Sequence, residues 1–131
     1  MKIINETLLD EVTRQAKESS RLRMNYNFHN SLDAKAQRLL NALEPGTLLP
    51  IHRHPHTAET YLLLRGKIRV IYYNDQKEVT ESVILDPRCG MYGIHIPSNQ
   101  WHTLEVLEGG SVIFEVKDGP YTPLGEQDIL F

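Results

Sequence analysis

The sequence predicts an all-β domain, a barrel or sandwich of short strands, preceded by one helix. From Leu48 onward, short apolar runs alternate with turn residues, and no segment among them is long enough for the helical crossovers of a parallel sheet. The chain has 131 residues, which is the size of one domain. We expect residues 1–45 to form a helix, a strand and a short helix packed on a barrel of residues 46–131.

The first element is predicted to be an amphipathic helix over residues 5–19. Leu8, Val12 and Ala16 recur at helical spacing, and Asn5 is suited to cap the N-terminus. A helix with one apolar stripe packs on the outside of a domain. We therefore expect it to cover part of the barrel.

The segment Arg21 to His29 alternates strictly between polar and apolar side chains, which is the period of a half-buried strand. A short helical turn is predicted from Asp33 to Leu39, before a turn at Pro45-Gly46. The later strands are predicted at the apolar runs. These are Thr60–Leu64, Ile68–Tyr73, Val83–Leu85, Ile94–Ile96, Thr103–Leu107 and Val112–Val116.

Composition excludes several classes of function. The net charge is −3 and the sequence pI is near 6.0, so neither nucleic acid nor an anionic membrane is an expected partner. The chain has no run of about 20 apolar residues, and its N-terminus turns polar too early for a secretory signal. We expect a cytoplasmic protein with a small-molecule ligand or substrate.

The densest chemistry lies in the segment His52-Arg53-His54, followed by Glu59. On an extended segment, residues two apart point to the same side, so His52 and His54 can chelate one ion. Glu59 would reach the same point after an intervening turn. His102 follows the turn Pro97-Ser98-Asn99 at the start of another strand and is the fourth candidate ligand.

Three imidazoles and a carboxylate favour Zn, Fe, Mn, Ni, Co or Cu over Mg or Ca. The order of metal affinities alone does not choose among these ions. A histidine pair on a strand is often only surface decoration, so a metal-free barrel is the alternative interpretation. The matching spacing of Glu59 and His102 favours the metal site.

This spacing resembles the two motifs of the cupin superfamily. The first motif is Gly, five residues, His-x-His, three or four residues, Glu, six residues and Gly. All five of its positions are met, by Gly46, His52, His54, Glu59 and Gly66. The resemblance implies a single double-stranded β-helix, or jelly-roll, barrel with the four metal ligands inside it.

The second motif departs from the pattern at two positions. Gly90, Pro97 and His102 match it, but Asn99 stands where Gly is usual and Val106 where Asn is usual. Asn tolerates the left-handed backbone that Gly supplies at such turns. The change at Val106 removes no metal ligand.

A narrower resemblance covers nearly the whole chain. The segments Arg21–His29, Gln37–Gly46 and Glu115–Tyr121 are similar to those of WbuC-type cupin metalloproteins. This likeness implies a place in bacterial surface-polysaccharide biosynthesis and a sugar-derived ligand, but no settled reaction. The cupin likeness also implies a homodimer.

The polar face of the Arg21–His29 segment has two interpretations. It is either the solvated face of an edge strand, or a wall of the metal pocket, since amides and guanidinium groups suit hydroxyl-rich or anionic ligands. The family likeness favours the pocket. The candidate ligand-binding residues are then Arg21, Asn25, Asn27, His29, Arg38 and Tyr61.

The leading functional hypothesis is a metalloenzyme of isomerase or epimerase type that acts on a small sugar derivative, with Glu59 as the candidate catalytic base. The alternative is a non-catalytic module that binds a metal and a small ligand. A purely structural barrel is the third hypothesis and requires that no metal be bound. The sequence leaves open whether the protein is an enzyme.

Overall fold

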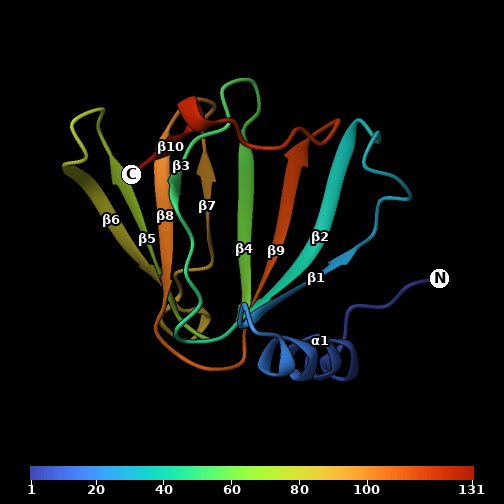
Figure 1. Cartoon of the computed structure of the whole chain (residues 1–131). Helices are drawn as coiled ribbons and strands as arrows, with labels where there is room; N and C mark the ends of the chain where they lie inside the picture. The colour runs from blue at the N-terminus through green and yellow to red at the C-terminus, as the bar shows by residue number, and fades with distance from the viewer.

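Ten short strands form two facing antiparallel sheets in the computed structural model, which describes residues 1–131 (Figure 1). The first sheet has the order β1 (Arg23–Asn27), β2 (Ala36–Leu43), β9 (Ser111–Asp118), β4 (Glu59–Arg65), β7 (Gly93–Ile96). The second has the order β10 (Ile129–Leu130), β3 (Ile51–His52), β8 (Trp101–Val106), β5 (Ile68–Tyr73), β6 (Val79–Leu85). This arrangement confirms the predicted single barrel with an N-terminal helix.

The helix α1 (Glu6–Glu18) lies where the sequence predicts it. The side-chain oxygen of Asn5 accepts a hydrogen bond of 3.0 Å from the backbone N–H of Leu8, which caps the first turn. The apolar stripe of α1 packs on the outer face of the first sheet (Figure 1). The buried residues of this contact are Leu9, Val12, Ala16, Leu40, Ala42 and Val112. No helix of the chain is both long enough and apolar enough to cross a membrane.

The alternating N-terminal segment forms β1, at one edge of the first sheet. Met24 and Tyr26 pack in the cluster beneath α1. Arg23 and Asn25 lie on the opposite face and line a cavity between the two sheets. One face of β1 is therefore apolar and the other polar, as the alternation predicts.

The predicted helical turn from Asp33 to Leu39 is wrong, because most of this segment belongs to β2. Its Ala, Gln, Arg and Leu residues are good helix formers. However, β2 pairs with β1 on one side and with β9 on the other. Leu40 and Ala42 face α1, whereas Leu43 packs in the barrel interior. Both faces are covered, so the segment lacks the polar alternation of a half-buried strand, and strand pairing overrides the helix propensity.

Strand β2 also connects the N-terminal segment to the rest of the barrel. It pairs with β9 along its whole length, from Ala36 opposite Asp118 to Leu43 opposite Ser111. Residues 1–45 and 46–131 thus contribute strands to the same sheet. The boundary at residue 45 stays a prediction.

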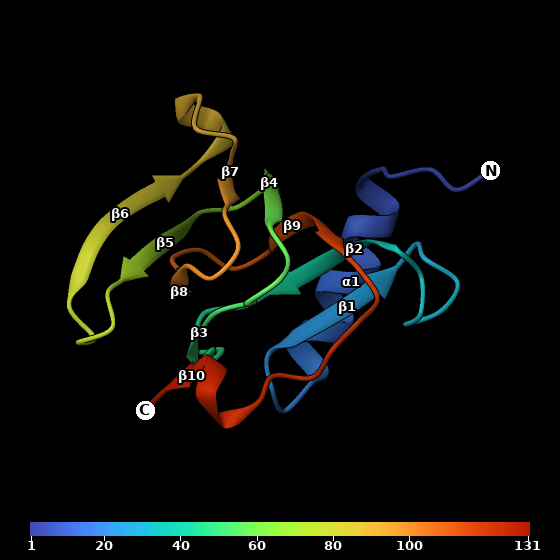
Figure 2. The ribbon, with the colours of Figure 1, turned by 90° about the horizontal axis from the view of Figure 1, so that it is seen from above.

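The barrel interior is polar at one end and apolar at the other. On β4, the buried side chains run from Glu59 through Tyr61 to Leu63, and on β8 they run from His102 to Val106. The apolar end is a cluster shared by both sheets, and its fully buried members include Ile68, Val70, Leu85 and Ile113. Seen from above, β3, β8 and β10 lie across from β4 and β9 around the polar end (Figure 2). The apolar end fixes the strands, and the polar end carries the chemistry.

Two glycines of the predicted motifs allow a matched test of backbone constraint. Gly66 has φ +97°, and a Cβ there would overlap Oγ of Ser111 and lie 2.5 Å from its Cα. Gly90 has φ +77°, but a Cβ there would meet nothing within 4 Å. The two positions therefore share the left-handed backbone and differ in the space around it.

We predict that Gly90→Ala lowers the free energy of unfolding by about 1–2 kcal/mol, the cost of a left-handed residue with a Cβ. Gly66→Ala should lower it by a further 1–3 kcal/mol or so, because overpacking against Ser111 adds to that cost. Urea unfolding followed by circular dichroism measures both values. Equal losses in the two variants would contradict the proposed contact.

Candidate metal centre

The four candidate ligands, which are far apart in the sequence, meet at the polar end of the barrel. One potential ligand atom from each of His52, His54, Glu59 and His102 lies within 4.8 Å of the others. His52 on β3 is directly opposite His102 on β8, in the second sheet. Glu59 begins β4 in the first sheet. The cluster therefore bridges the two sheets.

Backbone carbonyl groups orient two of the imidazoles. Nδ1 of His52 lies 2.9 Å from the carbonyl oxygen of Pro50, and Nδ1 of His102 lies 2.8 Å from that of Gln100. A carbonyl oxygen only accepts hydrogen bonds, so this geometry assigns the ring proton to Nδ1 in both residues. In a neutral ring, Nε2 then carries the lone pair that a metal ion would bind. Metal-binding histidines are commonly oriented in this way.

Glu59 is almost completely buried, with 3% of its surface exposed. Tyr61 donates a hydrogen bond of 2.8 Å from its hydroxyl to Oε2, and Nε2 of His54 lies 2.9 Å from Oε1. Burial by itself raises the pKa of Glu59, but the neighbouring His102 and His54 outweigh it and hold the pKa well below its usual range. The carboxyl group is therefore ionised, as a metal ligand must be.

The donor set fits a divalent transition metal. Burial, and then the neighbouring His102, lowers the pKa of His52 to about 4, so this imidazole is neutral near pH 7. Nε2 of His102 is buried and has no hydrogen-bond partner, although Oε2 of Glu59 lies 3.2 Å away. A buried nitrogen without a partner is costly unless a further group binds it. Three nitrogens and one carboxylate oxygen suit the ions predicted from the sequence.

A single turn links the two sequence motifs. Asn99 has φ +68°, so it adopts the left-handed backbone that the motif comparison predicted for this position. Its backbone N–H donates a hydrogen bond of 2.8 Å to the carbonyl oxygen of His54. The turn that delivers His102 therefore also supports the segment that carries His54.

A cavity of about 260 Å³ opens beside the cluster. It is lined by the four candidate ligands and by three of the six residues predicted to bind a small molecule, namely Arg21, Asn25 and Tyr61. The hydroxyl of Tyr61 already donates its hydrogen bond to Glu59. Burial raises the pKa of Tyr61 well above its usual value, and the charges of Glu59 and Glu115 raise it further. The phenolic hydroxyl therefore keeps its proton.

The other three predicted residues do not reach the cavity. Asn25 is the last residue of β1 that lines the cavity, whereas Asn27 ends the strand and His29 lies beyond it. His29 instead meets the backbone of Arg38, whose N–H donates to its Nδ1 at 3.1 Å. Arg38 itself is exposed on β2. Of the polar face predicted from the sequence, Arg21, Arg23 and Asn25 line the cavity, and ligand binding by the predicted residues stays a prediction.

The cavity also contains residues that were not predicted as site residues. Those with charged or amide side chains are Arg23, Asn41, Glu115 and Lys117. Glu115 and Lys117 follow Ile113 at two-residue intervals on β9, so they share its inward face. This parity was visible in the sequence. The apolar run on the same strand predicted only a core strand, so the two charged residues were not assigned to the site.

Glu115 differs from Glu59 in its electrostatics. Its Oε1 accepts a hydrogen bond of 3.3 Å from Nδ2 of Asn41. Burial first, and the charge of Glu59 second, raises the pKa of Glu115 to about 7. At neutral pH this carboxyl group is therefore present in both protonation states, unlike Glu59.

The C-terminal segment closes one side of the cavity. β10 pairs with β3, with Ile129 opposite His52, and Leu124 lines the cavity. Arg53 secures this segment: its Nε lies 3.3 Å from Oδ1 of Asp128, and its guanidinium lies 4.3 Å from the centroid of the Trp101 ring. Arg53 thus has a structural role.

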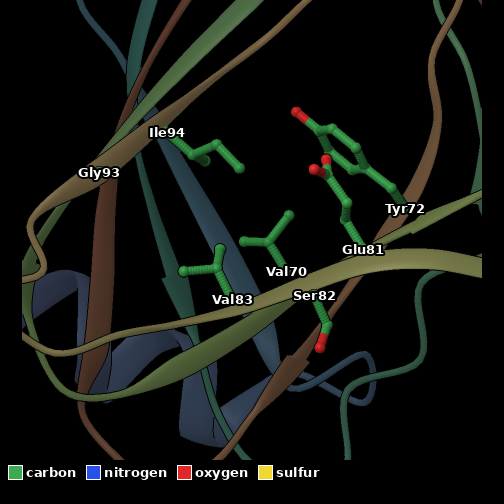
Figure 3. Close-up of a pocket in the computed structure, with 7 residues that line it drawn as sticks. All are labelled: Val70, Tyr72, Glu81, Ser82, Val83, Gly93 and Ile94. Atoms are coloured by element: carbon green, nitrogen blue, oxygen red, sulfur yellow. The ribbon is translucent and has the colours of Figure 1, made fainter.

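A second hollow, of about 350 Å³, lies between the edge strands of the two sheets (Figure 3). Val70, Val83 and Ile94 point into it, with Tyr72 and Glu81 side by side at one end. It shares no residue with the cavity at the cluster. The chemistry-bearing residues gather elsewhere, so the cluster is the candidate site.

Solved structures with the same fold include the Cnp3 cupin domain of Schizosaccharomyces pombe, with a TM-score of 0.59 and 9% identity over 73% of this chain and 64% of that chain. KdgF from Halomonas sp. has a TM-score of 0.60 and 15% identity over 76% of this chain and 82% of that chain. The capsular polysaccharide assembling protein CapF from Staphylococcus aureus has a TM-score of 0.66 and 18% identity over 86% of this chain. This chain spans about a third (32%) of CapF.

The facing sheets and these neighbours show that the chain has the fold of a cupin barrel, and its buried histidine and glutamate cluster suits a metal ion. The chain belongs to the family described as a domain of unknown function, DUF6016, whose model matches residues 4–85. No curated protein matches the chain significantly.

We predict that the protein, purified without a histidine tag, binds one Co²⁺ or Zn²⁺ per chain. His102→Ala should weaken binding by more than about 100-fold, since loss of an outer-shell partner alone costs about 10–100-fold. Elemental analysis after chelation and reloading, together with the visible absorption of bound Co²⁺, measures occupancy and affinity.

His95→Ala is the matched control for this experiment. His95 is exposed on β7, and its Nδ1 lies 2.9 Å from Oγ1 of Thr60, away from the cluster. The control should bind metal like the unmodified protein. Equal metal affinity in His102→Ala and His95→Ala would contradict the assignment.

Proposed function

We propose that this protein is a WbuC-type cupin that binds a divalent transition metal and acts on a small sugar-derived molecule in bacterial surface-polysaccharide biosynthesis. The observation that carries the proposal is the buried cluster of three imidazoles and Glu59 beside a polar cavity. The fold shared with CapF, a capsular polysaccharide assembling protein, supports the polysaccharide context. The likeness of Arg21–His29 and Glu115–Tyr121 to WbuC-type segments supports the subfamily.

The residues of the cavity are suited to the isomerisation or epimerisation of such a molecule. A bound divalent ion would polarise a carbonyl or hydroxyl group, or activate water. Isomerisation and epimerisation also need a side chain that removes a proton from the substrate and returns it. Glu59 was the sequence candidate, but its low pKa and its contacts with Tyr61 and His54 suit it better to holding the metal.

Glu115 is the better candidate for proton transfer. It lines the same cavity, and burial together with the charge of Glu59 raises its pKa to about 7. Asn41 binds its Oε1, which leaves Oε2 to face a substrate proton. The alternative function is a non-catalytic module, in which the same residues would only bind the metal and the ligand.

We predict that the metal-loaded protein incorporates solvent deuterium at a sugar carbon of at least one UDP-, GDP- or dTDP-hexose, because proton removal and return exchange that hydrogen. Glu115→Gln should lower the rate by about 10²–10⁴-fold, the usual contribution of a general acid or base, while it keeps the metal. His102→Ala should lose both metal and turnover. Proton NMR in D₂O measures the exchange.

His95→Ala again serves as the control and should keep full activity. Binding of a sugar nucleotide without deuterium incorporation would favour the binding module over the enzyme. Absence of any bound metal would leave only the structural barrel.

A further inference from the structure

Three arginines of the chain have no carboxylate partner. Of the eight arginines, five form ion pairs with Asp or Glu: Arg14, Arg53, Arg65, Arg69 and Arg88. Arg21, Arg23 and Arg38 form none. Arg21 and Arg23 line the cavity beside the cluster, whereas Arg38 lies outside it. The unpaired guanidinium groups are therefore concentrated at the site.

The two cavity arginines are held differently. Nη1 of Arg23 donates a hydrogen bond of 3.0 Å to the carbonyl oxygen of Leu48, which fixes the guanidinium on the cavity wall. The side chain of Arg21 makes no hydrogen bond and is exposed. One cation is thus preorganised, and the other is free to move onto a ligand.

The arginines also mark the junction of two hollows. A pocket of about 240 Å³ is lined by Ser19, Met24 and the three residues that it shares with the inner cavity, Arg21, Arg23 and Asn25. A ligand held at this junction has room on both sides. Its inner end would face the cluster, and its outer end would lie toward the end of α1.

Three cationic side chains and two carboxyl groups line the cavity at this junction. Burial, and then the charge of Arg21, lowers the pKa of Arg23, which shows that the two cations repel each other. Lys117 adds a third cation and lies 3.9 Å from Oε1 of Glu59. The carboxylates of the cavity are Glu59, which lies beside Lys117, and Glu115. A bound anion would relieve the repulsion.

We infer that the cavity takes a small polyhydroxylated anion, whose carboxylate or phosphate group lies between Arg21 and Arg23 and whose hydroxyl groups face the metal cluster. This inference rests on the proposed function and names the substrate class. A guanidinium presents paired N–H donors that match two oxygens of a carboxylate or phosphate. The amide of Asn25, which lines the same cavity, suits a sugar hydroxyl.

The test compares three probes by calorimetry on the metal-loaded protein: D-glucuronate, D-glucose 6-phosphate and the neutral methyl α-D-glucopyranoside. At least one anion should bind 10-fold or so more tightly than the neutral sugar, since charge-assisted hydrogen bonds are the stronger kind. The stronger of the two anions identifies carboxylate or phosphate as the recognised group. Its affinity should fall as salt is added.

The double variant Arg21→Gln/Arg23→Gln should weaken anion binding by about 100-fold and leave the neutral sugar within about threefold. Arg23→Lys keeps the charge but loses the paired N–H donors of the guanidinium, so we expect an intermediate loss of anion affinity. Arg38→Gln, the third unpaired arginine, is the matched control and should change neither affinity. Thermal unfolding of each variant verifies that it folds.

Anions that bind no more tightly than the neutral sugar, or whose binding survives the double variant, would overturn the inference and leave metal binding untouched. Failure of the protein to bind metal would instead count against the proposed function. In that case the same variants are compared in the metal-free protein. Loss of anion binding there supports the arginine site, and unchanged binding overturns it.

Discussion

The structure of the polar end depends on one constraint, the burial of the Glu59 carboxylate between two sheets. A buried carboxylate without partners is strongly destabilising, so its surroundings must supply them. Tyr61 comes from the same strand as Glu59, His54 from the loop after β3 and His102 from β8. The side chains around this one carboxylate therefore connect the two sheets at the polar end of the barrel.

The apolar end of the barrel makes this arrangement rigid. Along β4 and β8, the same strands that carry Glu59 and His102 continue into the buried core at Leu63 and Val106. Packed interiors resist displacement, so each ligand is placed by the part of its strand that lies in the core. The Asn99 turn and the Arg53 contacts add the same kind of support for His54 and for the C-terminal segment.

The sequence predicted the elements whose physical signature is local. The spacing of His52, His54, Glu59 and His102, the N-cap at Asn5 and the alternation of β1 each depend on residues a few positions apart. Strand β2 was missed because both its faces are covered, which removes the alternation that identifies a strand. The extent of the cavity could not be predicted from the sequence either. Which residues of β1 line it depends on the packing of segments far apart in the sequence, and no local pattern records that packing.

Two carboxyl groups face the same cavity, and their surroundings shift their pKa values in opposite directions. Burial raises the pKa of both, but two histidines reverse this effect for Glu59, whereas the charge of Glu59 adds to it for Glu115. Such a separation commonly divides roles between two acids in one site. A cation at the cluster would lower the pKa of Glu115, and an anion beside Arg21 and Arg23 would raise it again. The proton affinity of Glu115 therefore depends on the charges at both positions.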